Sequence, residues 1–242
     1  MVAGLTVPQF AAANAAVVFA AALQGSIGFG FGLAGAPLLL LVDPRLVPGP
    51  ILGVSFFLAL LSTIREHQAM HVHGMAWALV GRVPGTLLGA AAIAVLQARL
   101  VTLALGILIL SGVVMSVLRL RFPERRGTLV AFGALSGFMG TVSSIGGPPI
   151  ALLYQHAPGP RIRATLGGFF MVGVAMSIAA LAAVGRFGPA ELRVAGSLLP
   201  AMVLGFLISG TLAPVVDQGR SRIAVLAVSA IAAIAVILKE LL

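Results

Sequence analysis

The sequence predicts an all-α polytopic membrane protein made of two internally duplicated halves. The first observation is composition: 60% of the residues are hydrophobic and only 9% are charged, whereas soluble domains carry roughly a quarter charged residues. A chain of this size cannot bury so much apolar surface unless lipid surrounds it. The second observation is a glycine-rich apolar stretch, 24–41, that recurs at 136–153. We therefore expect two membrane repeats, 1–118 and 128–242, joined by the basic central loop 119–127.

The two glycine-rich stretches align at a constant offset of 112 positions. The matching residues are Gly25 with Gly137, Gly28 with Gly140, Gly35 with Gly147, and Pro37 with Pro149. As one helix, residues 8–42 would reach about 52 Å, far beyond the roughly 30 Å of a bilayer core. The segment must therefore break and fold back, as a hairpin of two legs or as a span with a re-entrant leg. Broken helices at matching positions of two repeats are typical of secondary transporters.

The other apolar segments bring the total to about eight full spans beside the short broken legs. We expect spans at 51–64, 75–96, 100–118, 162–184, 194–216 and 222–238, with broken pairs within 8–42 and 128–155. Glycine and proline also predict a further break inside the 75–96 span. The residues concerned are Gly81, Pro84, Gly85 and Gly89.

The relative orientation of the halves depends on whether each broken pair returns to the face from which it entered. A hairpin gives each half an odd number of crossings and inverts the repeats, whereas one net crossing leaves them parallel. The hairpin gathers more arginines on the face of the 119–127 loop, as the positive-inside rule requires. We therefore favour inverted repeats and leave the parallel arrangement open. The arginines expected on that face are Arg65, Arg119, Arg121, Arg125, Arg126, Arg161, Arg163, Arg220 and Arg222.

The net charge of +9 arises with only six acidic residues. In a soluble protein such a charge would favour a nucleic-acid partner, but these arginines lie mostly in short loops and are typical of topology signals. We therefore expect no nucleic-acid partner. The absence of cysteine excludes disulfides, thiol catalysis and cysteine-ligated metals, and we expect no cofactor and no metal site. The N-terminal apolar run lacks a basic region and a clear cleavage site, which favours a first membrane segment over a signal peptide.

The two helix breaks form the candidate binding site. Broken backbone is tolerated in a membrane only where protein or a water-filled cavity satisfies it, and the N-terminus of the leg after each break attracts anions. Two such ends facing each other would bind a small anion without a charged side chain. The candidates are Gln24, Gly25, Ser26, Gly28, Gly32 and Gly35, then Ser136, Gly140, Thr141, Ser143, Ser144, Gly146 and Gly147, with Ser55 and Thr165 in the following spans. The alternative is that these glycines serve helix packing and these hydroxyls bond to helix backbone.

Arg82 is the one basic residue well inside a predicted span. A charge within a membrane segment favours a functional role, and we count Arg82 among the candidate binding residues; the alternative is a side chain that snorkels to the nearby face. Leu198 stands at the matching position of the second half, so Arg82 is not part of the duplicated pattern. All six acidic residues lie in or beside loops, and a membrane carboxylate relay of the usual pump type is therefore not visible.

One group of residues carries a resemblance to a known family. It consists of Gly25, Gly28, Gly32, Gly35, Pro37, Gly137, Gly140, Gly146, Gly147 and Pro149, with the stretch 161–165 after the second motif. This pattern resembles the TauE/SafE sulfite exporter family. The resemblance implies a secondary transporter or facilitator that moves a small sulfur-containing anion, such as sulfite or an organosulfonate, across the plasma membrane. The partners implied are this anion and the lipid bilayer, and a homodimer is left open.

Two other classes of function remain as alternatives. An integral membrane enzyme would need acid, base or metal-binding side chains at one face, and only Glu66 with His67, His71 and His73 approaches that pattern. A non-transporting membrane subunit would use the glycine breaks for packing alone. We favour the transporter because both breaks recur with polar residues beside them.

Overall fold

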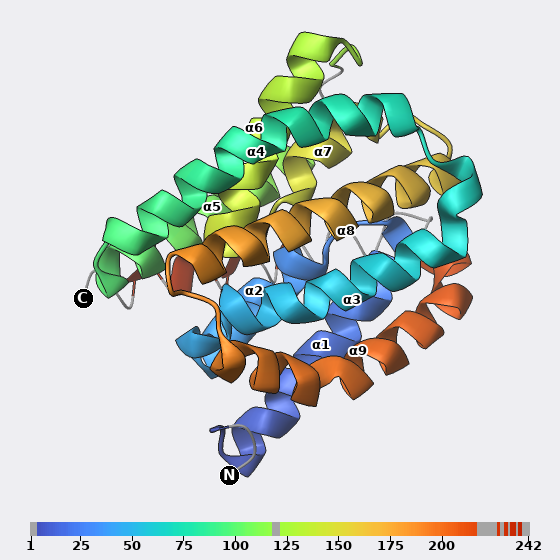
Figure 1. Cartoon of the computed structure of the whole chain (residues 1–242). Helices are drawn as coiled ribbons and strands as arrows, with labels where there is room; N and C mark the ends of the chain where they lie inside the picture. Colours follow the sequence, from blue (N-terminus) through green and yellow to red (C-terminus); the bar gives the residue numbers. More distant parts are fainter. Residues whose placement is uncertain are drawn as a thin grey trace.

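The computed structural model of the chain describes residues 4–117, 122–216, 227, 230, 231, 233–235, 237 and 238. These residues form helices and no strands (Figure 1). The elements in order are α1 (Val7–Ile27), α2 (Phe31–Val42), η1 (Pro44–Leu46), α3 (Gly49–Glu66), η2 (His67–Ala69), α4 (Val72–Val95), α5 (Ala98–Val117), α6 (Arg126–Ser143), α7 (Gly147–Tyr154), α8 (Gly159–Ala183) and α9 (Pro189–Val216).

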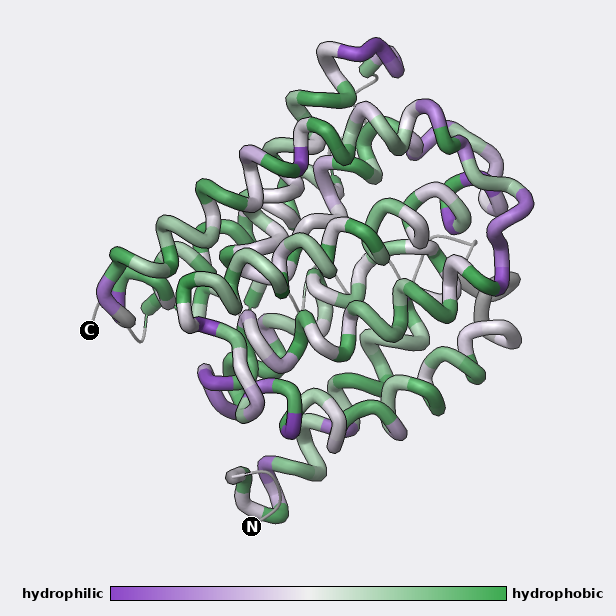
Figure 2. The backbone as a smooth tube through the Cα atoms, viewed as in Figure 1, coloured by the Kyte–Doolittle hydropathy of each residue, from purple (hydrophilic) through white to green (hydrophobic). Residues whose placement is uncertain are grey.

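Six helices among the described residues are long and apolar enough to cross a membrane. They are Val7–Ile27, Gly49–Ala69, Val72–Val95, Arg99–Val117, Gly159–Ala183 and Pro189–Thr211. Hydrophobic residues follow these helices, and hydrophilic residues gather at the turns between them (Figure 2). The all-α, multi-pass class is confirmed. The duplication and the total of eight spans stay predictions, and the expected span 222–238 falls largely outside the described residues.

The first broken segment is a hairpin of α1 and α2. Gly28 and Gly30 have φ angles of 96° and 116°, a left-handed conformation that glycine adopts without steric cost, so the chain leaves α1 and reverses within three residues. At the other end of the pair, the Gln9 side-chain amide donates to the Val42 carbonyl oxygen at 3.4 Å. The start of α1 and the end of α2 therefore lie together.

The second broken segment, α6 and α7, is also a hairpin. Ser144 ends α6 with a φ of 61°, and α7 begins at Gly147. Glu124, just before α6, lies 3.3 Å from His71, and the ring of Tyr154 at the end of α7 lies 6.3 Å from the same histidine. Both termini of this hairpin therefore lie beside the start of α4.

The two hairpins enter from opposite ends of the bundle. Helix α3 starts beside the end of the first hairpin, through η1, and ends at Glu66, which pairs with Arg163 near the start of α8 at 2.7 Å. We call the end of the bundle where Glu66 meets Arg163 the arginine-rich end. Of the arginines expected on one face, those that the structure describes all lie there: Arg65, Arg125, Arg126, Arg161 and Arg163. Arg119, Arg121, Arg220 and Arg222 lie outside the described residues.

The expected break inside the fourth helix is wrong, because α4 is continuous from Val72 to Val95. Its glycines serve packing instead: a Cβ added at Gly81 would overlap the backbone carbonyl of Val130, and one added at Gly85 would overlap that of Ala134. Helices α4 and α6 therefore approach backbone to backbone, as small residues allow in membranes. Pro84 lies within this helix. Proline is tolerated in a membrane helix because neighbouring helices help to satisfy the backbone group that loses its hydrogen bond.

Candidate functional site

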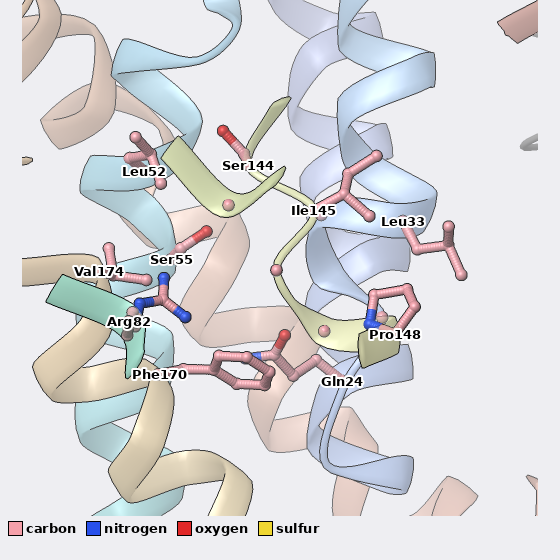
Figure 3. A pocket seen from close by; sticks show the side chains of 15 residues that line it. Gln24, Leu33, Leu52, Ser55, Arg82, Ser144, Ile145, Pro148, Phe170 and Val174 are labelled. Carbon is pink, nitrogen blue, oxygen red and sulfur yellow. The ribbon is translucent and has the colours of Figure 1, made fainter. Parts of the chain in front are cut away.

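The tips of the two hairpins meet inside the bundle and line a small pocket (Figure 3). They approach so closely that a Cβ added at Gly32 would overlap the carbonyl oxygen of Ser144. The pocket leaves about 30 Å³ open to the centre of a water molecule, which is room for one or two waters. Its lining is Gln24, Gly30, Gly32, Leu33, Leu52, Ser55, Arg82, Gly140, Ser144, Ile145, Gly146, Gly147, Pro148, Phe170 and Val174.

Eight of the sixteen candidate residues line this pocket: Gln24, Gly32, Ser55, Arg82, Gly140, Ser144, Gly146 and Gly147. They come from α1, α2, α3, α4, α6, the second break and the start of α7, so residues more than a hundred positions apart converge on one space. Figure 3 shows the side chains of Gln24, Ser55 and Arg82 around this space, beside the loop that carries Ser144. The pocket is thus assembled from both halves of the chain.

Arg82 is the charged group of the pocket. Its side chain is 1% exposed, so it does not snorkel to either face. Its Nη1 donates to the Ser136 hydroxyl at 3.0 Å, and its Cζ lies 4.8 Å from the centre of the Phe169 ring. Three of the four described carboxylates form ion pairs elsewhere: Asp43 with Arg45, Glu66 with Arg65 and Arg163, and Glu124 with His71 and Arg161. The fourth, Glu191, accepts from the Gly188 backbone N–H.

Glycines hold the guanidinium of Arg82 on three sides. A Cβ added at Gly140 would lie 3.0 Å from Nη2, and one added at Gly146 would lie 3.3 Å from Nη1. A Cβ at Gly173 of α8 would overlap Nε, which has no hydrogen-bond partner among the described residues. The cavity for this side chain therefore exists because three neighbouring residues have no side chain.

Ser136 connects Arg82 to the second break. Its hydroxyl accepts from Arg82 Nη1 and donates to the Gly146 carbonyl oxygen at 2.6 Å. A buried arginine side chain needs hydrogen-bond acceptors, and this serine supplies one while fixing the backbone of the break. The orientation of the guanidinium and the position of the hairpin tip are therefore coupled through one side chain.

At the starts of α2 and α7, some backbone N–H groups are already bonded or missing. The Gln24 side-chain oxygen accepts from the backbone N–H of Phe31 at 3.2 Å, so one N–H group in the first turn of α2 already has an acceptor. Helix α7 begins Gly147, Pro148, Pro149, and proline carries no N–H. The anion site expected at the two helix ends stays a prediction, and Arg82 is the charged side chain that lines this pocket.

The remaining candidate hydroxyls do not line the pocket, because each is engaged elsewhere. Ser26 donates to the Ala22 carbonyl oxygen at 2.8 Å, and Ser143 donates to that of Met139 at 2.7 Å. Thr141 shares a hydrogen bond with Ser177, and Thr165 accepts from the backbone N–H of His71. These contacts match the alternative role in helix packing.

The remaining candidate glycines also lie against neighbouring elements. A Cβ added at Gly25 would overlap Ser209 of α9, and one at Gly28 would meet the backbone of Arg163 at 2.9 Å. A Cβ added at Gly35 would lie 3.3 Å from the Cβ of Ala20 in α1. Gly25 and Gly35 lie within helices, so the first break is confined to three residues, 28–30.

His71, just before α4, forms ion-pair contacts at the arginine-rich end. His71 Nδ1 lies 3.3 Å from Glu124 and 3.0 Å from Arg161 Nη2. Across the described residues, no group of three or more histidine, aspartate or glutamate side chains is placed to hold a metal ion. The enzyme alternative, which would use Glu66 with His67, His71 and His73, stays an untested alternative.

Comparison with models of known protein families gives a match over most of the chain. The family model described as Sulfite exporter TauE/SafE matches residues 13–236. The matched region contains the first hairpin from residue 13 onward, the whole second hairpin and every residue that lines the pocket around Arg82. Neither a curated protein nor a solved structure matches the chain.

Proposed function

The chain belongs to the Sulfite exporter TauE/SafE family, and from this premise we propose that it carries sulfite or a small organosulfonate across the plasma membrane through the Arg82 pocket. The observation that carries the proposal is the Arg82 guanidinium, which is 1% exposed and lies between the two helix breaks without an ion pair to a described carboxylate. A buried charge is costly unless it is paired. A bound anion would supply that pair in the transport cycle.

The chemistry of the pocket suits a small oxyanion. A guanidinium presents several N–H donors in a planar fork that matches the oxygens of an oxyanion. The Gln24 amide and the Ser55 hydroxyl line the same pocket and add uncharged polar groups. Because the pocket has room for only one or two waters, the hairpin tips must separate when the anion enters. Binding and movement of the two halves are thereby coupled.

The packing of the helices supports inverted repeats and alternating access. Helix α4 of the first half packs on α6 of the second, and α9 of the second half packs on α1 of the first. Helices α3 and α8, which follow the two hairpins, pack on each other between these pairs. Each half thus packs one of its helices on the hairpin of the other half, and the two hairpins enter from opposite ends of the bundle. This arrangement is expected of two inverted repeats that rock around a central site.

The membrane potential is the driving force that we propose for export. None of the four described acidic residues lies in the pocket, since Asp43, Glu66, Glu124 and Glu191 all sit at helix ends or in loops. Moving one negative charge outward gains about 2.3 kcal/mol per 100 mV. This corresponds to a concentration ratio of roughly fiftyfold across the membrane.

The test is anion flux in proteoliposomes. Purified protein is reconstituted with sulfite inside, and efflux is followed with and without a potassium-diffusion potential. We expect sulfite efflux to be faster when the sulfite-containing side is negative. We also expect small organosulfonates to inhibit this efflux by competition. If the efflux rate does not depend on the membrane potential, the proposed driving force is wrong. If no sulfur oxyanion shows protein-dependent efflux, the proposed function is wrong.

A Ser136→Ala substitution tests the link between Arg82 and the second break. It removes an acceptor from Arg82 and the donor to the Gly146 carbonyl, at a cost of about 1–2 kcal/mol, so we expect flux to fall about tenfold. The matched control is Ser197→Ala, whose hydroxyl bonds to the Val194 carbonyl within α9 and lies outside the pocket. Equal flux in both variants would show that Ser136 does not position Arg82.

A further inference from the structure

A second pocket lies between the Arg82 pocket and the arginine-rich end. Helix ends at that side of the bundle line it: Ile27 of α1, Met115 of α5, Leu152 of α7 and Ile162 of α8, with Gln155 just beyond α7. It leaves about 130 Å³ open to the centre of a water molecule, which is more than four times the space of the Arg82 pocket. Apart from Gln155 and Ser116, the lining side chains are apolar.

A thin partition separates the two pockets. Pro148 lines both of them. Phe29 lines the second pocket and packs on Gly147 of the first: a Cβ added at Gly147 would lie 3.5 Å from Phe29 Cβ and 3.7 Å from Phe170 Cζ. The half-buried Phe29 therefore stands at the boundary, with one pocket on each side.

The backbone around Phe29 is built to turn. Gly28 and Gly30 flank it with φ angles of 96° and 116°, so both of its neighbours adopt a conformation that side chains disfavour. Only Gly28, Phe29 and Gly30 connect α1 to α2. Residues that absorb large φ and ψ changes at the ends of elements are the usual hinges of gating segments. A change at either glycine would swing the aromatic ring.

We propose that the second pocket is the part of the transport path that leads to the arginine-rich end, and that Phe29 closes it off from the Arg82 pocket. This inference rests on the proposed function. An apolar constriction stops a hydrated anion because the anion would have to shed water there. When the hairpin tips separate, the Phe29 ring leaves the boundary and the anion moves from Arg82 into the wider pocket.

Cysteine labelling tests this path directly, because the chain contains no cysteine. Single thiols are introduced by Ala151→Cys in the second pocket, Val174→Cys in the Arg82 pocket, and Val203→Cys, which is 40% exposed on the outer surface of α9. A charged, membrane-impermeant thiosulfonate is applied from the arginine-rich face of sealed vesicles. We expect the thiol at 151 to react at least about tenfold faster than that at 203, because water reaches only the former.

The gate is tested by combining Val174→Cys with Phe29→Ala. We expect the labelling rate at 174 to rise about tenfold when the ring is removed, and to rise by an intermediate amount with Phe29→Leu, the milder variant if Phe29→Ala does not fold. The control Phe19→Ala removes a ring that is 45% exposed on α1, the helix before this turn, and should leave the rate unchanged. An unreactive thiol at 151, or an unchanged rate at 174 in the folded Phe29 variant, overturns the path. Labelling needs no transport, so failure of the proposed function shows separately, as wild-type vesicles without sulfite flux.

Discussion

Replacing Arg82 with glutamine is expected to lower sulfite flux by about a hundredfold, because removing one side of a buried, hydrogen-bonded charge pair costs roughly 3 kcal/mol or more. Glutamine keeps polar atoms of similar reach but no charge. The anion would then enter a pocket in which the remaining lining groups are uncharged. The effect should appear in binding as well as in flux, as a loss of thermal stabilisation by sulfite.

Two further variants separate charge from geometry at Arg82. Arg82→Lys keeps the charge but replaces the planar fork by a single ammonium group, so we expect partial flux and weaker discrimination among oxyanions. Arg45→Gln is the control, since the Arg45 side chain is 75% exposed and pairs with Asp43 in a loop. If Arg82→Gln folds normally and transports sulfite at the wild-type rate, Arg82 is not the anion-binding group.

Replacing Gly32 with alanine is expected to destabilise the fold by about 2–3 kcal/mol, as overpacking of a close contact does. The added methyl group would overlap the Ser144 carbonyl oxygen, a backbone atom that cannot move away by changing rotamer. The hairpin tips must then separate, which distorts the pocket between them. We expect a lower melting temperature in detergent and a loss of flux in the protein that still folds.

Gly196→Ala provides the matched control for Gly32→Ala. Gly196 lies within α9, and a Cβ added there would meet nothing within 4 Å. Alanine favours a helix over glycine by up to about 1 kcal/mol, so this control should be neutral or slightly stabilising. Equal melting temperatures for the two variants would contradict the close approach of the hairpin tips.

The membrane class and the existence of two breaks follow from properties that need no tertiary structure. An apolar segment such as 8–42 is too long for one span whatever surrounds it, and glycines are the residues at which it can reverse. Gly28 and Gly30 illustrate this, because their left-handed φ angles are a local requirement of the turn. The sequence pattern also led to the family, which the match over residues 13–236 confirms.

The membership of the pocket was decided by packing between distant helices. Ser143 and Ser144 are neighbours with the same side chain, yet Ser143 bonds to the Met139 carbonyl and Ser144 lines the pocket. The difference arises because Ser144 leaves the helix with a positive φ. Phe170 and Val174 complete the lining from α8, and nothing about an apolar residue in an apolar span distinguishes them beforehand.

Arg82 shows most clearly where information from the sequence ends. By itself, the sequence determined that this is a membrane protein, that its helices break at two glycine clusters and that one arginine lies within a span. A single arginine near a membrane face can either snorkel or turn inward, and local composition is the same in both cases. Only the tertiary structure decided between them, because Gly140, Gly146 and Gly173 come from separate segments to leave room for the guanidinium. Side-chain direction depends on which neighbours are small, and those neighbours are assembled by the fold.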